Sequence, residues 1–231
     1  MAGFRMRSLS SWISERALHR AMPLRHPLPP MREYAIAPDF AWMLWETVRR
    51  DRPETIVETG SGVSTIVMAY ALEETGRGHV YALEHDRHYA AQTRTELAKH
   101  GLSRWATVID APLEPIEIRG ERHRWYSVRA LDWIDTIDLV VDDGPPRCAG
   151  TMLRYASLFV FAPRLAPNAT FLLDVIGREE PGILARWAKE LPDFVQTRLD
   201  TTKGNVIITR APAFGDERSA RPDLAAPSMD S

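Results

Sequence analysis

Residues 55–65 read TIVETGSGVST, and this stretch decides how the rest of the sequence is interpreted. The β-branched run at 55–57 is typical of a short buried strand. Gly60 and Gly62 permit a tight turn after it, and Ser64 is placed to cap a helix over residues 64–74. In doubly wound α/β proteins such a turn brings the backbone close to a bound nucleotide. Alone, the pattern could also be ordinary turn chemistry, so the residues around it carry the argument.

Strands alternate with helices along the rest of the chain, which predicts a Rossmann-like α/β fold with helices on both faces of the sheet. Seven strands are expected, at residues 55–57, 79–83, 106–109, 137–141, 170–173, 194–199 and 205–209. The last two flank a turn at 201–204 and are typical of a hairpin, so one strand of the mostly parallel sheet runs antiparallel. Helices are expected near residues 38–50, 64–74, 87–100, 128–134, 151–161 and 182–191.

Acidic residues end four successive strands of this predicted sheet. In strand order they are Glu58, Glu84, Asp110, and Asp142 with Asp143. Ligands of doubly wound sheets bind at the carboxyl ends of the strands, so we expect these side chains to line a site. Glu84 lies 22 residues beyond Gly62, about where a nucleotide site places the carboxylate that accepts the ribose hydroxyls. Solvation of strand ends could explain one or two of these acids, but not all four.

The first turn favours a ligand with a positively charged end over a dinucleotide. A dinucleotide fold needs a third glycine in the first helical turn, where this chain has Thr65. Glu58 also adds negative charge where a pyrophosphate would lie. S-adenosylmethionine carries a sulfonium and an ammonium beside an adenosine, and therefore suits this turn.

These residues resemble those of the class I S-adenosylmethionine-dependent methyltransferases. More narrowly, the chain is similar to a small bacterial subgroup with GSGVST at 60–65, APL at 111–113, WY at 125–126 and DGPP at 143–146. The resemblance implies that Gly60 and Gly62 lie against the methionine part of the donor and that Glu84 holds the ribose. It also implies that Asp110 with Ala111 faces the adenine, and that Asp142 borders the place where donor and acceptor meet. The donor-binding residues expected are Glu58, Thr59, Gly60, Ser61, Gly62, Ser64, Thr65, Glu84, His85, Asp110, Ala111 and Asp142.

Methyl transfer from a sulfonium requires an aligned acceptor and, for a hydroxyl, a base that removes its proton. The candidates for that base are Asp143, Asp174 and His123. His123 lies in a polar insertion at 117–126, where Trp125 and Tyr126 either cover an acceptor or belong to the local core. For His123 a place on a surface loop is the favoured alternative.

A metal site at these strand ends is not favoured. Related metal-using O-methyltransferases have an acidic or amide pair after the fifth strand, whereas here Asp174 is followed by Val175. A divalent metal held by three carboxylates is nevertheless an alternative, and those carboxylates are Asp142, Asp143 and Asp174. Otherwise Asp174 pairs with Arg178 or Lys203.

The whole chain suits one globular domain with two extensions. It has 231 residues, 45% of them hydrophobic, and a formal net charge of −2, which argues against bulk electrostatic binding of nucleic acid. The single Cys148 excludes an internal disulfide, and no run of about 20 apolar residues predicts a membrane span, so we expect a cytoplasmic protein. The expected division is a basic helical arm and Pro-rich connector at 1–37, the folded domain at 38–210 and a disordered tail at 211–231.

The arm contains a predicted amphipathic helix at 8–22. This helix packs on the domain or on a second subunit in a homodimer, or it serves as a membrane-surface or targeting segment. We expect the protein to transfer a methyl group from S-adenosylmethionine to a small-molecule acceptor, and the preferred acceptor atom is oxygen. Two alternatives stay open: an NAD(P)-dependent oxidoreductase, and a non-catalytic nucleotide-binding adapter or sensor.

Overall fold

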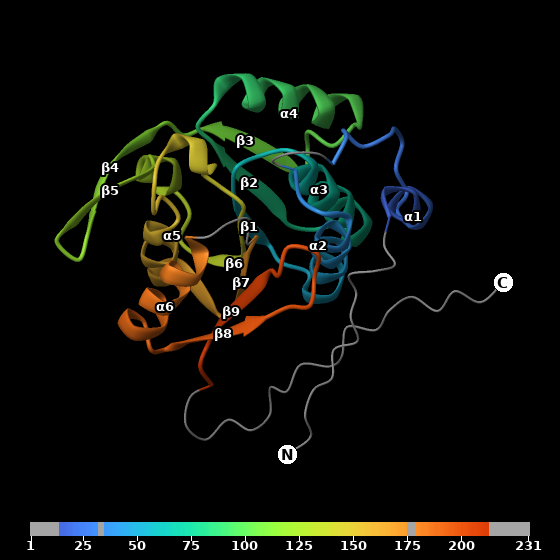
Figure 1. The fold of residues 1–231 in the computed structure, drawn as a ribbon. Coiled ribbons are helices and arrows are strands. Elements are labelled where there is room, and N and C mark those ends of the chain that lie inside the picture. Colours follow the sequence, from blue (N-terminus) through green and yellow to red (C-terminus); the bar gives the residue numbers. More distant parts are fainter. Residues whose placement is uncertain (1–13, 32–34, 175–178, 213–231) are drawn as a thin grey trace, which may run out of the picture.

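A seven-stranded sheet with the strand order β3-β2-β1-β6-β7-β9-β8 forms the centre of the computed structural model, which describes residues 14–31, 35–174 and 179–212 (Figure 1). Its strands are β1 (Thr55–Thr59), β2 (His79–Glu84), β3 (Ala106–Asp110), β6 (Ile137–Asp142), β7 (Leu165–Leu173), β8 (Phe194–Arg198) and β9 (Val206–Arg210). Neighbouring strands are parallel except that β9 is antiparallel to both β7 and β8. The predicted Rossmann-like fold with one antiparallel strand near its C-terminus is therefore confirmed.

Helices cover both faces of the sheet (Figure 1). On one side lie α2 (Pro38–Asp51), α3 (Val63–Thr75) and α4 (Arg87–Lys99), and on the other α5 (Tyr155–Phe161) and α6 (Glu180–Glu190). Alternate residues of each central strand enter opposite cores, as the two-residue period of a strand requires. Ile56 packs in the core beneath α2 and α3, whereas Val57 packs in the core beneath α5 and α6.

The register of the strands brings the predicted acidic residues to one edge. Thr59 pairs with both Leu83 and Asp142, and Glu84 pairs with Asp110. The carboxyl ends of β1, β2, β3 and β6 are therefore level. Side chains that follow one another at long intervals in the sequence meet at this edge because the strands are parallel and in step.

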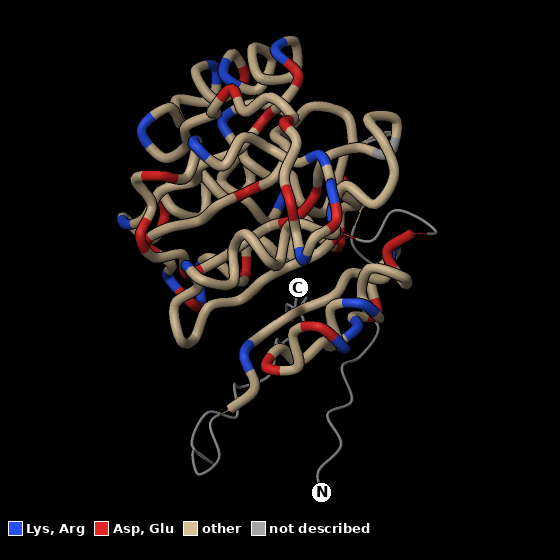
Figure 2. Tube along the Cα trace, turned by 90° about the vertical axis from the view of Figure 1, so that its left-hand side faces the viewer, with Lys and Arg blue, Asp and Glu red and all other residues tan. Residues whose placement is uncertain are grey.

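A β-hairpin of β4 (Leu113–Ile118) and β5 (Glu121–Tyr126) follows β3 and projects from the domain (Figure 1). The sequence indicated only a polar insertion here, so this element is a correction to the prediction. The helix expected at 128–134 is a single 3₁₀ turn (Val128–Leu131), and the one expected at 151–161 begins only at Tyr155. Figure 2 shows basic and acidic residues interspersed along the chain on the side of the molecule that carries the hairpin.

The N-terminal segment packs on the domain. Helix α1 (Glu15–Ala21) covers only part of the predicted helix at 8–22, because residues 8–13 lie outside the described part of the chain. Leu18 and Met22 are buried in the same core as α2 and α3, and so are Leu28 and Ile36 of the connector. A homodimer through the arm stays a prediction, and most of the expected tail at 211–231 lies outside the described residues. No helix within the described ranges is long and apolar enough to cross a membrane.

Candidate active site at the carboxyl ends of the strands

The turn after β1 has the open backbone that its glycines predict. Gly60 and Gly62 have φ angles of +88° and +155°, which side-chain-bearing residues rarely adopt. A Cβ on Gly62 would meet nothing within 4 Å, so its backbone faces open space. Helix α3 begins at Val63, one residue earlier than predicted, and the Gly62 N–H donates to Thr65 Oγ1 at 3.0 Å. The helix is thus capped through Gly62 and Thr65, and the predicted cap at Ser64 is wrong.

Glu58 lies beneath this turn and is fully buried. Thr65 Oγ1 donates to its Oε2 at 2.6 Å, while Oε1 has no hydrogen-bond partner among the described residues. Burial raises the pKa of Glu58 to about 8, because the charged form is poorly solvated there. The hydrogen bond from Thr65 opposes the rise, and the negative charge of Glu84 adds to it.

Glu84 is held at the end of β2 by polar groups of two neighbouring segments. Ser61 Oγ donates to its Oε2 at 3.1 Å, and the backbone N–H of Asp86 donates to its Oε1 at 3.0 Å. The Nδ1 atom of His85 lies 3.1 Å from the same Oε1. Ser61 Oγ also lies 3.1 Å from Thr93 Oγ1 in α4, within hydrogen-bond distance. Ser61 therefore links the first turn both to Glu84 at the end of β2 and to α4.

Asp110 differs from the other strand-end acids because its side chain is 54% exposed. It accepts a hydrogen bond of 2.9 Å from Nη2 of Arg94 in α4. Ala111 is buried, and its N–H donates to the carbonyl oxygen of Glu84 at 2.8 Å. The adenine contact expected of this segment stays a prediction.

Asp142 ends β6 next to the first turn. Its Oδ1 accepts a hydrogen bond of 2.6 Å from Thr59 Oγ1, which in turn accepts the N–H of Gly144 at 3.1 Å. The carboxylate is completely buried, and this burial raises its pKa to about 6. The nearby charge of Arg154 and the hydrogen bond from Thr59 lower it in part.

Asp174 ends β7 and is already paired. Its Oδ1 accepts from Asn205 Nδ2 at 2.6 Å, and its Oδ2 accepts from Lys203 Nζ at 3.3 Å. The predicted pairing with Lys203 is confirmed, whereas the alternative partner Arg178 lies outside the described residues. In the described ranges no three His, Cys, Asp or Glu side chains are grouped so that they could hold a metal ion.

Asp143 faces both Asp174 and a buried arginine that the sequence did not single out. Burial and the adjacent Asp174 carboxylate raise the pKa of Asp143 well above its usual range. The Nη2 atom of Arg154 lies 3.7 Å from Asp143 Oδ1, and its Nη1 donates to the backbone carbonyl of Asp174. Arg154 immediately precedes α5 and lies inside the helix predicted at 151–161. The sequence pattern did not indicate where this one arginine side chain would lie.

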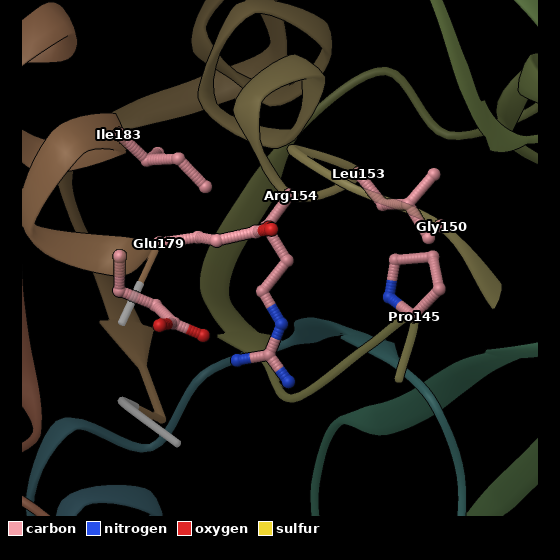
Figure 3. A pocket seen from close by; sticks show the side chains of 7 residues that line it. Pro145, Gly150, Leu153, Arg154, Glu179 and Ile183 are labelled. Carbon is pink, nitrogen blue, oxygen red and sulfur yellow. The ribbon is translucent and has the colours of Figure 1, made fainter. Parts of the chain in front are cut away.

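Arg154 also lines a small cavity beside the ends of β6 and β7. Figure 3 shows its side chain extending between Pro145 on one side and Glu179 on the other. The cavity has a volume of about 10 Å³, which is room for about one water molecule. Its lining residues are Pro145, Gly150, Leu153, Arg154, Glu179, Glu180 and Ile183.

The hairpin places its three predicted residues differently. His123 stacks on Tyr155 of α5 with ring centres 4.8 Å apart, and its Nε2 lies 3.5 Å from Glu121 Oε2. Trp125 packs against Phe161 of α5, at 5.3 Å between rings. Tyr126 instead faces His85 next to the strand ends, at 6.0 Å. The described contacts of His123 are therefore with the hairpin and α5, and its role as a base stays a prediction.

Comparison with known proteins identifies the family of this site. A family model described as "Methyltransferase domain" matches residues 57–176, more than half of the chain, and includes the first turn and the ends of β2, β3, β6 and β7. No curated protein matches the chain.

Solved structures with the same fold include several methyltransferases. A putative O-methyltransferase from Klebsiella pneumoniae is 18% identical, with a TM-score of 0.60 over 86% of this chain and 96% of that one. The O-methyltransferase from Bacillus cereus in complex with SAH is 15% identical, with a TM-score of 0.59 over 78% and 84% of the two chains. SAH-bound PaMTH1 from Podospora anserina is 16% identical, with a TM-score of 0.58 over 78% and 81%. At these identities the likeness shows the fold. The family match over the site decides against the dinucleotide alternative, and the chain belongs to this methyltransferase family as a class I, S-adenosylmethionine-dependent enzyme.

Proposed function

We propose that the enzyme methylates an oxygen atom of a small molecule, with Asp143 as the base. The observation that carries this proposal is the carboxyl group of Asp143 directly after β6, whose buried Oδ1 has no hydrogen-bond partner among the described residues. An oxygen acceptor needs a base for its proton, and a buried carboxylate with a raised pKa is a stronger base than one in water. The names of the B. cereus and K. pneumoniae structures support oxygen as the methylated atom.

The residues of the first turn and of β2 fit the methyl donor. The open backbone at Gly62 accepts the methionine part at close range, and the unpartnered Oε1 of Glu58 suits its ammonium group. Glu84, already oriented by Ser61, would hold the ribose hydroxyls. When bound, S-adenosylmethionine supplies an electrophilic methyl group on a sulfonium, so no further activation of the donor is required.

Asp143 is favoured over the other two candidate bases by its surroundings. Both oxygens of Asp174 accept hydrogen bonds from other side chains, and His123 packs against Tyr155. In the proposed step the Asp143 carboxylate accepts the proton of the acceptor hydroxyl while the oxygen forms its bond to the methyl carbon. The bond from that carbon to the sulfonium sulfur breaks at the same time, its electron pair stays on sulfur, and S-adenosylhomocysteine leaves. Arg154 stabilises the ionised form of Asp143 before this transfer. Because the base must be ionised, we expect the rate to rise with pH through the pKa of Asp143.

The test uses S-adenosylmethionine labelled with ¹³C in the transferred methyl group, incubated with the protein and a small-molecule extract. The carbon shift of the product separates methyl groups on oxygen from those on nitrogen or carbon. We expect an O–CH₃ product, and an Asp143→Asn variant that loses turnover by at least about 100-fold while binding S-adenosylhomocysteine normally. An N–CH₃ or C–CH₃ product would refute oxygen as the acceptor atom, and unchanged turnover of Asp143→Asn would refute the base. A protein that binds donor and yields no product in any fraction would be the adapter.

A further inference from the structure

Tyr126, at the end of β5, carries a buried hydroxyl that the proposed reaction does not use. Its side chain is 1% exposed, and its Oη has no hydrogen-bond partner among the described residues. Buried tyrosine hydroxyls normally find a partner, because leaving one unpaired costs about 1–3 kcal/mol. A retained hydroxyl without a partner inside a site therefore points to a ligand that completes it.

The hydroxyl lies where the ends of β1 and β6 meet. A Cβ on Gly144 would overlap Tyr126 Oη, and the same Cβ would lie 3.1 Å from Gly60 N and 3.2 Å from Thr59 C. Tyr126 thus reaches from the hairpin to the first turn, across the residues that follow Asp142. Only a residue without a side chain at Gly144 leaves this space to the phenol.

The ring of Tyr126 lies beside the end of β2. The Tyr126 ring meets His85 edge to face, and His85 Nδ1 lies 3.1 Å from Glu84 Oε1. Burial raises the pKa of Tyr126 well above 10, and Glu84 contributes the largest charge effect in the same direction. The phenol therefore keeps its proton and offers a neutral donor beside a carboxylate. The opposite side of β5 is different, since Trp125 there packs against Phe161 in the core.

We propose that Tyr126 is a donor-binding residue whose hydroxyl hydrogen-bonds the adenosine part of S-adenosylmethionine beside Glu84. The β4–β5 hairpin then forms one wall of the donor site in addition to projecting from the domain. This proposal rests on the placement of the donor given above, with the ribose at Glu84. The hairpin, whose sequence is mostly polar, would then have a role in binding the donor.

The test compares Tyr126→Phe with Tyr70→Phe as a matched control. Tyr70 of α3 is equally buried. Its Oη accepts the Arg25 N–H at 2.9 Å and lies 2.7 Å from His100 Nδ1, so its contacts do not involve the strand ends. Calorimetric titration with S-adenosylhomocysteine and with 5′-methylthioadenosine measures affinity, and thermal unfolding without ligand measures stability. The second ligand keeps the adenosine part and lacks the amino acid.

We expect Tyr126→Phe to weaken both ligands by about 3- to 10-fold, the range of one hydrogen bond to a neutral group, without lowering the melting temperature. Tyr70→Phe should lower the melting temperature and leave both affinities unchanged. Wild-type affinity for both ligands in Tyr126→Phe would overturn the proposal, as would a loss confined to S-adenosylhomocysteine, which would move the contact to the amino acid part. If Glu84→Gln binds as the wild type does, the donor placement itself fails, whatever Tyr126→Phe shows.

Discussion

Substituting Glu58 by glutamine should change how the stability of the protein depends on pH. Glutamine keeps the shape of the side chain and can still accept the hydrogen bond from Thr65, but it does not titrate. Glu58 is fully buried, and burial raises its pKa from 4.5 to about 8. A group with a raised pKa in the folded state contributes stability that is fully present below 4.5 and is lost as the pH rises through about 8.

The size of the effect follows from the two pKa values. Each pKa unit of difference between the folded and the unfolded state corresponds to about 1.4 kcal/mol, so the whole shift corresponds to roughly 5 kcal/mol. The interval from about pH 6 to pH 8 lies between these two pKa values. The free energy of unfolding of the wild type should therefore fall by roughly 2 kcal/mol over that interval, relative to Glu58→Gln. Other titrating groups are common to both proteins and largely cancel in the difference.

Urea unfolding followed by tryptophan fluorescence provides the measurement, with both proteins examined at several pH values. The quantity of interest is the difference between their free energies of unfolding at each pH, which requires that both unfold in one cooperative step. A difference that stays constant to within about 0.5 kcal/mol would refute the reasoning, since Glu58 would then have the same pKa folded and unfolded. A difference that grows in favour of the wild type as the pH rises would have the wrong sign and refute it equally.

Three further predictions concern the same strand ends. Binding of S-adenosylhomocysteine near pH 7 should release up to about one proton from Glu58, because the ligand ammonium favours the ionised carboxylate. Calorimetric titrations in buffers of different ionisation enthalpy measure the number of protons released. Zero release would contradict a contact between the ammonium and Glu58. Gly144→Ala should lower the free energy of unfolding by about 1–3 kcal/mol through overlap with Tyr126 Oη, and adding Tyr126→Phe should recover part of the loss; a double-mutant cycle with no coupling would count against the packing. Arg154→Met should cost about 3–5 kcal/mol in urea unfolding by leaving buried carboxylates without their cation, and a neutral outcome would show that Asp143 keeps its proton.

The sheet could be predicted from the sequence because its signals are local and repeated. Apolar runs of strand length alternate with helical periodicity, and the turn at 201–204 indicates the final hairpin. The β4–β5 hairpin lacks such signals. Its turn is formed by Arg119 and Gly120, both with positive φ angles, where asparagine or aspartate before glycine is the usual pattern. Its strands also carry charges at both alternate and adjacent positions, although Ile118 beside the turn is buried and Glu121 pairs with Arg186 of α6.

The carboxylate row could also be predicted, because parallel strands in register bring their ends to one edge. What each acid contacts there could not. Asp110 has the same place in the pattern as Glu84, yet it is exposed and paired with Arg94, while Glu84 is buried. The difference depends on Arg94 of α4, whose side chain also reaches the carbonyl of Val108. A periodic pattern predicts which face a helix buries, but not where a long flexible side chain ends.

Asp174 shows most clearly why the chemistry of the site needed the fold. The sequence allowed two roles for Asp174, a metal ligand or a member of an ion pair, and both need only a carboxylate at the end of the strand. The choice depends on the antiparallel pairing of β7 with β9, which sets Leu173 opposite Val206 and so brings Asn205 and Lys203 to the end of β7. With both of its oxygens occupied, Asp174 has little left to offer an acceptor, and it acts instead on its neighbour. Its charge is one of the causes that raise the pKa of Asp143, so the partners of Asp174 determine which of the two acids is free to move a proton.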